Sequence, residues 1–191
     1  MKFAREYYFI RHAKTESFKG IYGALDVPIG AVEHEKIREL ADIVPHGALW
    51  VSSLLKRCIQ TAELIRERLG ETGEVQILNE LAEQNFGEFE GLAKEKLETK
   101  PPTPYWLFRR DFRPLRGESF DDLVERATAV LRSLDSFESN LIVALTHGNF
   151  LRALLASILD LKSDVPSKIE IMNLSIVHIG RTKEGRIHLV L

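Results

Sequence analysis

A histidine follows an apolar run at two places in this sequence, and an arginine precedes the first of them. Arg11 and His12 come directly after the run 7–10, which is rich in the aromatic and β-branched residues typical of a buried strand. The run 141–145 ends two residues before His147 in the same way. An α/β protein places its chemistry outside the carboxyl ends of its strands, so we expect these side chains to belong to a functional site. For Arg11 and His12 alone, a basic pair that caps a strand is the alternative.

Arg57 adds another cation in a comparable place, one helical turn after the short apolar run 48–51. A surface arginine is the alternative interpretation. However, the neighbouring Lys56 would already satisfy a solvated face, and Arg57 adjoins the apolar positions Cys58 and Thr61. Cations therefore concentrate near three strand ends, although the chain as a whole, with 26 basic and 28 acidic residues, has a net charge of −2.

Guanidinium groups and imidazoles that converge near helix N-termini suit a phosphate group. Arginine donates paired hydrogen bonds to phosphate oxygens, and the helix dipole favours an anion. A metal ion is the competing use of two histidines, but arginines beside them would repel a divalent cation, and no carboxylate lies at ligand spacing from His12 or His147. We therefore expect a phosphate site that needs neither a metal nor another cofactor.

Strands and helices alternate along the chain without repeats or a linker. This alternation predicts one α/β domain over residues 1–191, built as a three-layer α/β/α sandwich with a mostly parallel sheet. We expect Ser52 or Ser53 to cap the second helix and Ser119 to open the third. Strands are predicted at 7–10, 48–51, 75–78 and 141–145, a terminal hairpin at 176–179 and 187–190, and helices at 31–44, 54–70, 119–134 and 149–161.

Residues 92–116 are predicted to form a short cap over the site, because prolines stand there beside aromatic residues that polar linkers lack. Together with Phe18 and Tyr22, three of these aromatic residues favour a partly apolar substrate pocket, with core or cap packing as the alternative; the three are Tyr105, Trp106 and Phe108. Arginines in the same segment are candidates for a second anionic contact or for simple solvation. The aromatic residues are Tyr105, Trp106, Phe108 and Phe112, and the arginines are Arg109, Arg110, Arg113 and Arg116.

Composition excludes several classes of protein. Apolar residues at 45% and charged residues at 28% are ordinary globular values. No apolar run is long enough to cross a membrane, and the first residues lack the apolar core of a signal peptide. The single cysteine, Cys58, fits a reducing compartment. We expect a cytoplasmic protein whose partner is a small phosphorylated substrate, not nucleic acid or a membrane, while the oligomeric state stays open.

Five short motifs stand in the order that one family shows, and they span the chain from Arg11 to about Arg152. Together they make the chain resemble the histidine phosphatase superfamily, which includes cofactor-dependent phosphoglycerate mutases, fructose-2,6-bisphosphatases and α-ribazole phosphatases. The chain is most similar to the small phosphatase branch with the α-ribazole phosphatases. The motifs are Arg-His-x-x-Thr at 11–15, Ser-x-x-x-Arg-x-x-x-Thr-Ala at 53–62, Leu-x-Glu-x-x-Phe-Gly-x-x-Glu-Gly at 81–91, Gly-Glu-Ser at 117–119 and His-Gly-Asn at 147–149.

The resemblance implies a role for each residue of the predicted site. His12 would be the nucleophile that takes the phosphoryl group, and Arg11, Arg57 and His147 would hold its non-bridging oxygens. Glu83 would protonate the leaving alkoxide and then activate water. An imidazole must be neutral to attack phosphorus, and adjacent guanidinium groups disfavour its protonation. Without the resemblance, Glu83 would be interpreted as a solvated loop carboxylate.

The resemblance also implies contacts with the rest of the substrate. The backbone at Gly148 and Asn149 would contact phosphate, and Tyr22 and Gly23 would line the substrate loop. The substrate itself stays open among a sugar phosphate, a nucleotide-like phosphate such as α-ribazole phosphate, and a phosphoprotein.

Departures from the family favour a simple phosphatase. Phe18 stands where many members have an asparagine that contacts phosphate, and the segment between Gly91 and Gly117 is much shorter than in the glycolytic mutases. Ala13 replaces the usual glycine after the nucleophile, which is tolerable if φ stays negative. We therefore expect a metal-independent phosphomonoester hydrolase that acts through a phosphohistidine on a small phosphorylated metabolite. A phosphoglycerate-mutase-type transfer and a non-catalytic phospho-ligand binder are the alternatives.

Chelation tests the expectation that arginines take the place of a metal cation. Because Arg11 and Arg57 are expected to neutralise the phosphate, an excess of EDTA should leave the initial rate of p-nitrophenyl phosphate hydrolysis unchanged. A loss of activity that a divalent ion restores would contradict a metal-free site.

Overall fold

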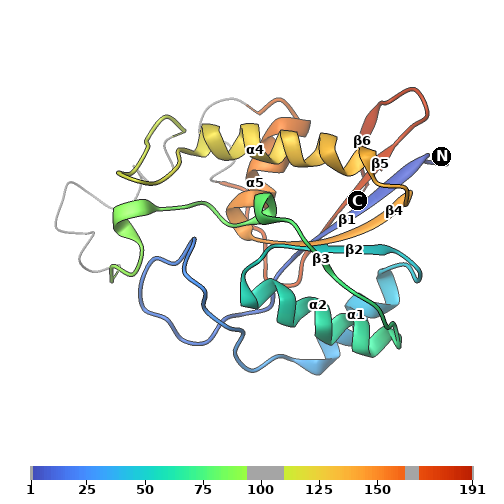
Figure 1. The fold of residues 1–191 in the computed structure, drawn as a ribbon, viewed down its shortest axis with the longest axis horizontal. Coiled ribbons are helices and arrows are strands. Elements are labelled where there is room, and N and C mark those ends of the chain that lie inside the picture. The colour runs from blue at the N-terminus through green and yellow to red at the C-terminus, as the bar shows by residue number, and fades with distance from the viewer. Residues whose placement is uncertain (1, 94–109, 162–167, 191) are drawn as a thin grey trace.

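A computed structural model of the chain describes residues 2–93, 110–161 and 168–190 (Figure 1). Its centre is a six-stranded sheet with the strand order β3-β2-β4-β1-β5-β6. The strands are β1 (Arg5–Arg11), β2 (Leu49–Ser52), β3 (Gln76–Ile77), β4 (Leu141–Thr146), β5 (Ile176–Arg181) and β6 (Ile187–Val190).

The sheet is mostly parallel, as predicted. Strands β1, β4, β2 and β3 run parallel to one another, whereas β5 is antiparallel to both β1 and β6. The predicted terminal hairpin is therefore confirmed. The carboxyl ends of the four parallel strands share one edge of the sheet, and the loops that follow them lie at that edge.

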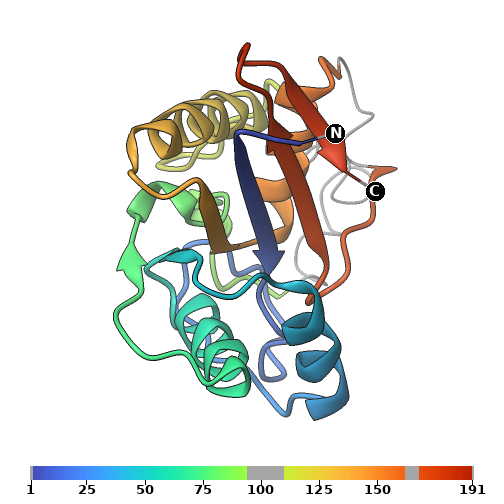
Figure 2. The same ribbon diagram turned by 90° about the vertical axis from the view of Figure 1, so that its right-hand side faces the viewer.

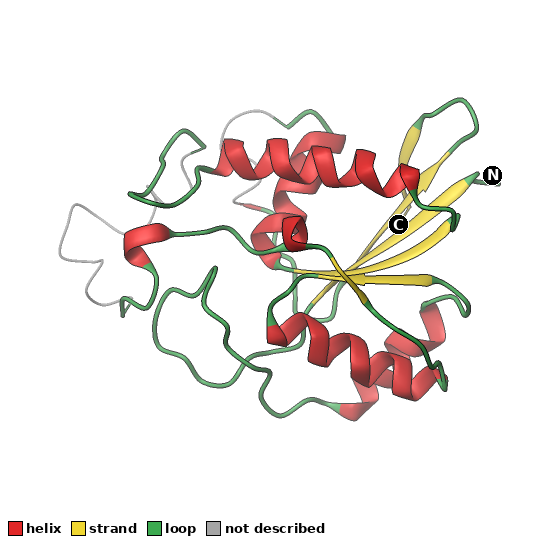
Figure 3. Cartoon of the chain, in the orientation of Figure 1, coloured by secondary structure: helices red, strands yellow, loops and turns green. Residues whose placement is uncertain are grey.

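Helices cover both faces of the sheet, which confirms the three-layer architecture. Helices α1 (His34–Ile43) and α2 (Lys56–Leu69) lie on one face, and α4 (Phe120–Ser133) and α5 (Gly148–Ile158) lie on the other, as Figure 2 shows from the side. Figure 3 shows the strands as the middle layer. Short 3-10 turns are present at Asn79–Leu81, Gly87–Phe89 and Leu134–Ser136.

Alternation along the strands explains why both faces are apolar. In β1, Tyr7 and Phe9 pack in the core that includes residues of α4 and α5, whereas Ile10 packs in the core that includes residues of α1 and α2. In β4, Ile142 and Val143 divide between the same two cores. Successive side chains of a strand point to opposite faces, so a continuous apolar run can serve both layers.

Helix α1 begins later than the expected start at residue 31. Glu33 keeps an extended backbone just before the helix, and no side chain caps its first turn. The N–H of Gly30 donates to the carbonyl of Lys14 (2.9 Å), which holds the entry segment against the loop that follows β1. This long-range pairing keeps the approach to the helix extended.

The expectation that Ser52 or Ser53 caps the second helix is wrong. Ser52 belongs to β2, and the N-cap position of α2 is Leu55, which makes no side-chain cap. The Oγ of Ser53 accepts a hydrogen bond from the N–H of Leu55 (3.3 Å) and lies 2.9 Å from Nε2 of His147. Ser53 therefore contacts His147, which follows β4, and does not cap α2.

Most of the predicted cap lies outside the described residues, which stop at residue 93 and resume at residue 110. Arg110 pairs with Asp121 (2.6 Å) and Arg113 pairs with Asp122, and both carboxylates belong to the first turn of α4. These two arginines are therefore engaged with α4. The residues of the earlier predictions that lie outside the described part are Tyr105, Trp106, Phe108 and Arg109.

The N-terminus of α4 offers a test of local stability. Ser119 and Asp122 form a capping box, in which each side chain accepts a hydrogen bond from the other residue's backbone N–H. Replacing Ser119 with Ala should lower the free energy of unfolding by about 1 kcal/mol, measured by urea denaturation. Ser136→Ala is the control, because Ser136 is exposed and its loss should change the free energy by less than about 0.5 kcal/mol. Equal effects of the two changes would contradict the capping box.

Candidate active site

The parallel pairing of β1 and β4 brings the two histidines together. Arg11 stands opposite Thr146 in the register, and the N–H of His12 donates to the carbonyl of Thr146 (3.0 Å). His12 and His147 therefore follow neighbouring strand ends, and their ring centroids lie 5.1 Å apart. Both side chains are buried, with 2% of His12 and 0% of His147 exposed.

One ring nitrogen of His12 is held by its own backbone. Nδ1 lies 2.7 Å from the carbonyl oxygen of Ala13. A carbonyl can only accept, so Nδ1 carries the proton in this contact and Nε2 of the neutral ring keeps its lone pair. Ala13 is not among the described residues with positive φ, as its substitution for glycine requires.

Burial keeps the imidazole of His12 neutral. Desolvation lowers its pKa to about 3, and the positive charges of Arg57 and Arg11 act in the same direction, while the hydrogen bond to Ala13 opposes them. The sequence-based expectation named the guanidinium groups as the cause of neutrality. Their effect has the expected sign, but burial is the larger cause.

Arg57 is completely buried, although arginine is rarely found in an interior. Nη2 donates to the carbonyl of Gly23 (2.6 Å), Nη1 donates to the carbonyl of Leu25 (2.7 Å), and Nε donates to Nδ1 of His147 (3.1 Å). Burial lowers the pKa of Arg57 from its usual value. A guanidinium group has five N–H donors, so two remain for a ligand beyond these three bonds.

Gly23 and Tyr22 bring the substrate loop close to this arginine. A Cβ on residue 23 would lie 1.8 Å from the carbonyl oxygen of Gln84, so only glycine fits there. The ring of Tyr22 lies 5.4 Å from Cζ of Arg57, and its hydroxyl is 2.9 Å from Oγ1 of Thr15. The loop predicted to line the substrate site is thus fixed against Arg57.

His147 has partners at both ring nitrogens. Nδ1 accepts from Arg57, so Nε2 carries the proton of the neutral ring and donates to Oγ of Ser53 (2.9 Å). Sγ of Cys58 also lies 3.3 Å from Nε2. Burial lowers the pKa of His147 well below its usual value, and the positive charge of Arg57 adds to this. In this arrangement His147 orients Arg57, and its direct contact with phosphate stays a prediction.

The guanidinium group of Arg11 keeps an N–H donor available for a ligand. Its Nη1 donates to the carbonyl of Ile171, while Nε is buried and finds no acceptor in the described part of the chain. A Cβ on residue 148 would lie 3.3 Å from this Nε, so Gly148 lets the guanidinium group approach the N-terminus of α5 closely. A buried donor without an acceptor favours an anion at this point.

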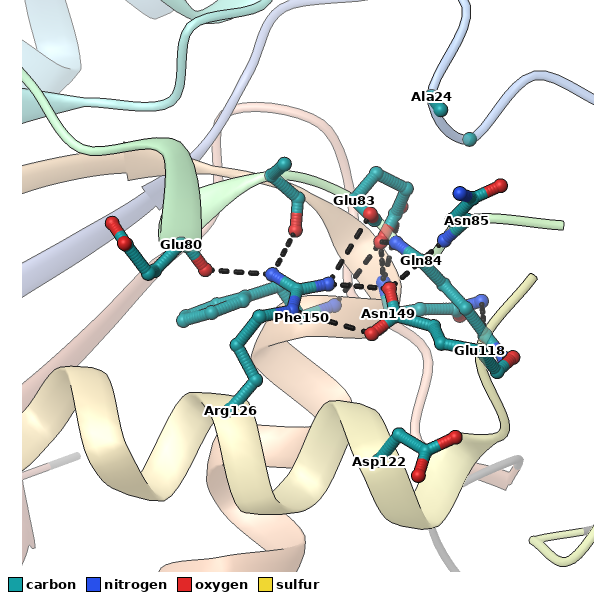
Figure 4. A network of polar contacts seen from close by, with 12 residues as sticks. Ala24, Glu80, Glu83, Gln84, Asn85, Glu118, Asp122, Arg126, Asn149 and Phe150 are labelled. Atoms are coloured by element: carbon teal, nitrogen blue, oxygen red, sulfur yellow. Dashed lines mark hydrogen bonds and ion pairs between the residues drawn. The ribbon is translucent and has the colours of Figure 1, made fainter. Parts of the chain in front are cut away.

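Glu83 lies on that same helix N-terminus (Figure 4). Its Oε1 accepts from the N–H groups of Asn149 (3.1 Å) and Phe150 (3.2 Å) in the first turn of α5, and from the N–H of Gln84 (3.0 Å). An anion is favoured there by the helix dipole and the free N–H groups. The Glu83 carboxylate thus occupies the backbone N–H of Asn149, and the phosphate contact that the resemblance implies there stays a prediction.

Three further residues support the site and were missed as contacts by the sequence analysis. Ser53 contacts His147, although it was noted only as the first residue of a motif. Nδ2 of Asn173 donates to the carbonyl of His12 (2.9 Å), and no local pattern marks this asparagine. Arg126 binds the segment that carries Glu83, from a helix more than 40 positions away.

Within the described ranges, no group of three or more His, Cys, Asp and Glu side chains is placed to hold a metal ion. No helix in that part of the chain has both the length and the apolar character needed to span a bilayer.

The family model for the histidine phosphatase superfamily (branch 1) matches residues 7–191 of this chain. The chain belongs to this superfamily. Phosphoglycerate mutase-like protein 4 of Arabidopsis thaliana is 30% identical over 76% of this chain and 67% of its own length. Glucosyl-3-phosphoglycerate phosphatase of Mycolicibacterium vanbaalenii is 27% identical over 84% of this chain and 76% of its own length.

A solved structure shares the fold over nearly the whole length of both chains. The mycobacterial glucosyl-3-phosphoglycerate phosphatase superposes with a TM-score of 0.80, at 24% identity, and covers 98% of each chain. Proteins of the superfamily with phosphatase names are thus among the neighbours of this chain in both sequence and structure.

The buried His12 makes stability depend on pH. The unfolded chain binds a proton near pH 6.5 and the folded chain binds it only near pH 3, so unfolding takes up a proton between these values and stability falls as pH falls. Between pH 7 and pH 5 the wild type should therefore lose about 2 kcal/mol more unfolding free energy than His12→Asn. Urea denaturation at the two pH values measures this difference. His34→Asn, at an exposed position, is the control and should behave like the wild type; if His12→Asn does so too, the buried neutral imidazole is contradicted.

Proposed function

We propose that the protein is a metal-independent phosphomonoester hydrolase that acts through a phosphohistidine at His12. The observation that carries this proposal is the contact between Nδ1 of His12 and the Ala13 carbonyl, which leaves Nε2 as a free nucleophile. Nearby donors support it, namely the Nε of Arg11, which has no acceptor among the described residues, and the two remaining N–H groups of Arg57. Positioning and charge neutralisation are the main requirements of phosphoryl transfer.

In the first step, Nε2 of His12 attacks phosphorus and the bond from phosphorus to the alcohol oxygen breaks. Arg11 and Arg57 hold the non-bridging oxygens as charge builds on them. Glu83 delivers a proton to the leaving alkoxide, which departs as the alcohol. For this the Glu83 side chain has to carry a proton and turn from the N–H groups of α5 toward the substrate.

In the second step, water attacks the phosphohistidine. The Glu83 carboxylate accepts a proton from this water as the oxygen–phosphorus bond forms. The phosphorus–nitrogen bond breaks, the electron pair returns to Nε2, and inorganic phosphate is released. The low pKa of His12 favours a neutral ring after each cycle.

Features of the chain and of its relatives support hydrolysis over mutase-type transfer. A mutase must protect its phosphohistidine from water until the second substrate arrives. Phe18, in the position of a phosphate-binding asparagine, is 40% exposed and packs edge-on against Tyr22. A relative named as a glucosyl-3-phosphoglycerate phosphatase supports hydrolysis of a small phosphorylated metabolite, while the mutase-like relative keeps transfer as the second candidate. The cytoplasm as its location is part of the proposal.

A trapping experiment tests the nucleophile. Glu83→Gln should still accept the phosphoryl group from p-nitrophenyl phosphate, which needs little protonation, but should release it at least about a hundredfold more slowly. After an alkaline quench, intact mass and peptide mapping should place one acid-labile phosphoryl group on His12. Adding His12→Ala should abolish it, whereas adding His34→Ala should not. A phosphoryl group on another residue, or full turnover by His12→Ala, would refute the proposal.

Product analysis separates hydrolysis from transfer. With 3-phosphoglycerate and its bisphosphate primer, the wild type should release inorganic phosphate, since a water-accessible phosphohistidine is hydrolysed. Interconversion of 2- and 3-phosphoglycerate at rates far above phosphate release would favour the mutase. Tight binding of phosphate esters without turnover of any of them would favour a non-catalytic binder.

A further inference from the structure

Glu83 stands in a segment without regular secondary structure. Residues 82–86 lie between two 3-10 turns and belong to no helix or strand. Ladder hydrogen bonds therefore cannot fix the position of this backbone. A general acid or base has to stand within hydrogen-bond reach of the reacting atoms, so other contacts must hold the segment in place.

Arg126, in the middle of α4, makes these contacts (Figure 4). Its Nη1 donates to the carbonyls of Glu80 (2.6 Å) and Ala82 (2.7 Å), and its Nη2 lies 3.3 Å from the carbonyl of Glu83. One guanidinium group thus binds three carbonyls over four successive residues. The planar fork of arginine can hold several acceptors in fixed directions.

Glu118 holds the guanidinium group from its other side. Nη2 of Arg126 donates to Oε1 (2.6 Å) and Nε donates to Oε2 (3.3 Å), and both side chains are mostly buried, with 22% of Arg126 and 19% of Glu118 exposed. The same Oε1 accepts from the N–H of Asn85 (2.9 Å), and the N–H of Glu118 donates to the carbonyl of Asn85 (2.9 Å). The Arg126–Glu118 pair therefore binds backbone groups on both sides of Glu83.

Arg126 also contacts the residue that receives the Glu83 carboxylate. Its guanidinium group lies over the ring of Phe150, 5.8 Å from the ring centroid. The N–H of Phe150 donates to Oε1 of Glu83. One side chain thus links the backbone of Glu83 to the helix terminus on which its carboxylate lies.

We propose that Arg126, held by Glu118, is the positioning residue of Glu83: it sets the distance of this carboxyl from the phosphoryl group without touching the substrate. This rests on the proposed function, in which Glu83 is the acid and base. A displacement of about 1 Å can reduce catalysis roughly a hundredfold, so the loss of several fixed hydrogen bonds should be visible in the rate.

The experiment compares two esters of similar shape, phenyl phosphate and p-nitrophenyl phosphate. The value of kcat/KM reports the steps up to departure of the leaving group, and phenolate needs the proton from Glu83 more than p-nitrophenolate does. Arg126→Met removes every donor but keeps a long unbranched side chain over Phe150, and Arg126→Lys keeps the charge. Arg132→Met, at an exposed position of the same helix, is the matched control.

Arg126→Met should lower kcat/KM for phenyl phosphate by about tenfold to a hundredfold, and clearly less for p-nitrophenyl phosphate. Arg126→Lys should lie between Arg126→Met and the wild type, and Arg132→Met should match the wild type. When Glu83 is already Gln, Arg126→Met should cause less than about a twofold further loss, because the two residues act through one group.

Equal losses for the two esters, or losses that multiply when Arg126→Met and Glu83→Gln are combined, would refute the positioning role. If Arg126→Met does not fold, the same comparison is made with Arg126→Lys, whose leaving-group dependence then decides. Failure of the proposed function looks different: Glu83→Gln alone would show no dependence on the leaving group. If Glu83→Gln shows this dependence and the Arg126 variants do not, only the positioning role is overturned.

Discussion

The arrangement of the site depends on keeping the guanidinium group of Arg57 out of water. A fully buried charge is unfavourable unless hydrogen bonds satisfy it, and here the partners come from parts of the chain that are far apart. The carbonyls of Gly23 and Leu25 belong to the loop after β1, and His147 follows β4. Satisfying this one cation therefore closes the substrate loop onto the strand ends. Lys56, its exposed neighbour, pairs with Asp26 of the same loop at the surface and needs no such burial.

Glu83 places a negative charge near the cations of the site. Its charge raises the pKa values of Arg57 and Arg152 against the effect of burial, and its carboxylate accepts from the first turn of α5. A phosphate dianion would offer the same cations and the same N–H groups a stronger partner. On the proposed function, substrate binding thus competes with Glu83 for the helix terminus. The carboxyl group that the chemistry needs would then be released beside the leaving group.

Parallel strand ends made much of the fold and of the histidine pair predictable. The apolar runs before His12 and His147 predict strands, and such strands end at the same edge of a sheet, so their neighbours meet. Contacts between segments that are far apart in the chain leave no comparable pattern in the sequence. Ser53 follows a strand and precedes a helix, which favours a cap, but His147 competes for its hydroxyl. Nothing in its spacing distinguishes Arg126 from other arginines of an amphipathic helix, and only the fold brings it to the carbonyls beside Glu83.

The most direct test of the nucleophile is a crystal structure with vanadate, which takes the trigonal bipyramidal geometry of phosphoryl transfer. Because Nδ1 of His12 is bound to the Ala13 carbonyl, vanadium should bond to Nε2. Its oxygens should lie within hydrogen-bond distance of Arg11 and Arg57, with Glu83 facing the apical oxygen opposite Nε2. Vanadate bonded to Nδ1, or bound away from His12 with the histidine unchanged, would contradict the proposed phosphohistidine.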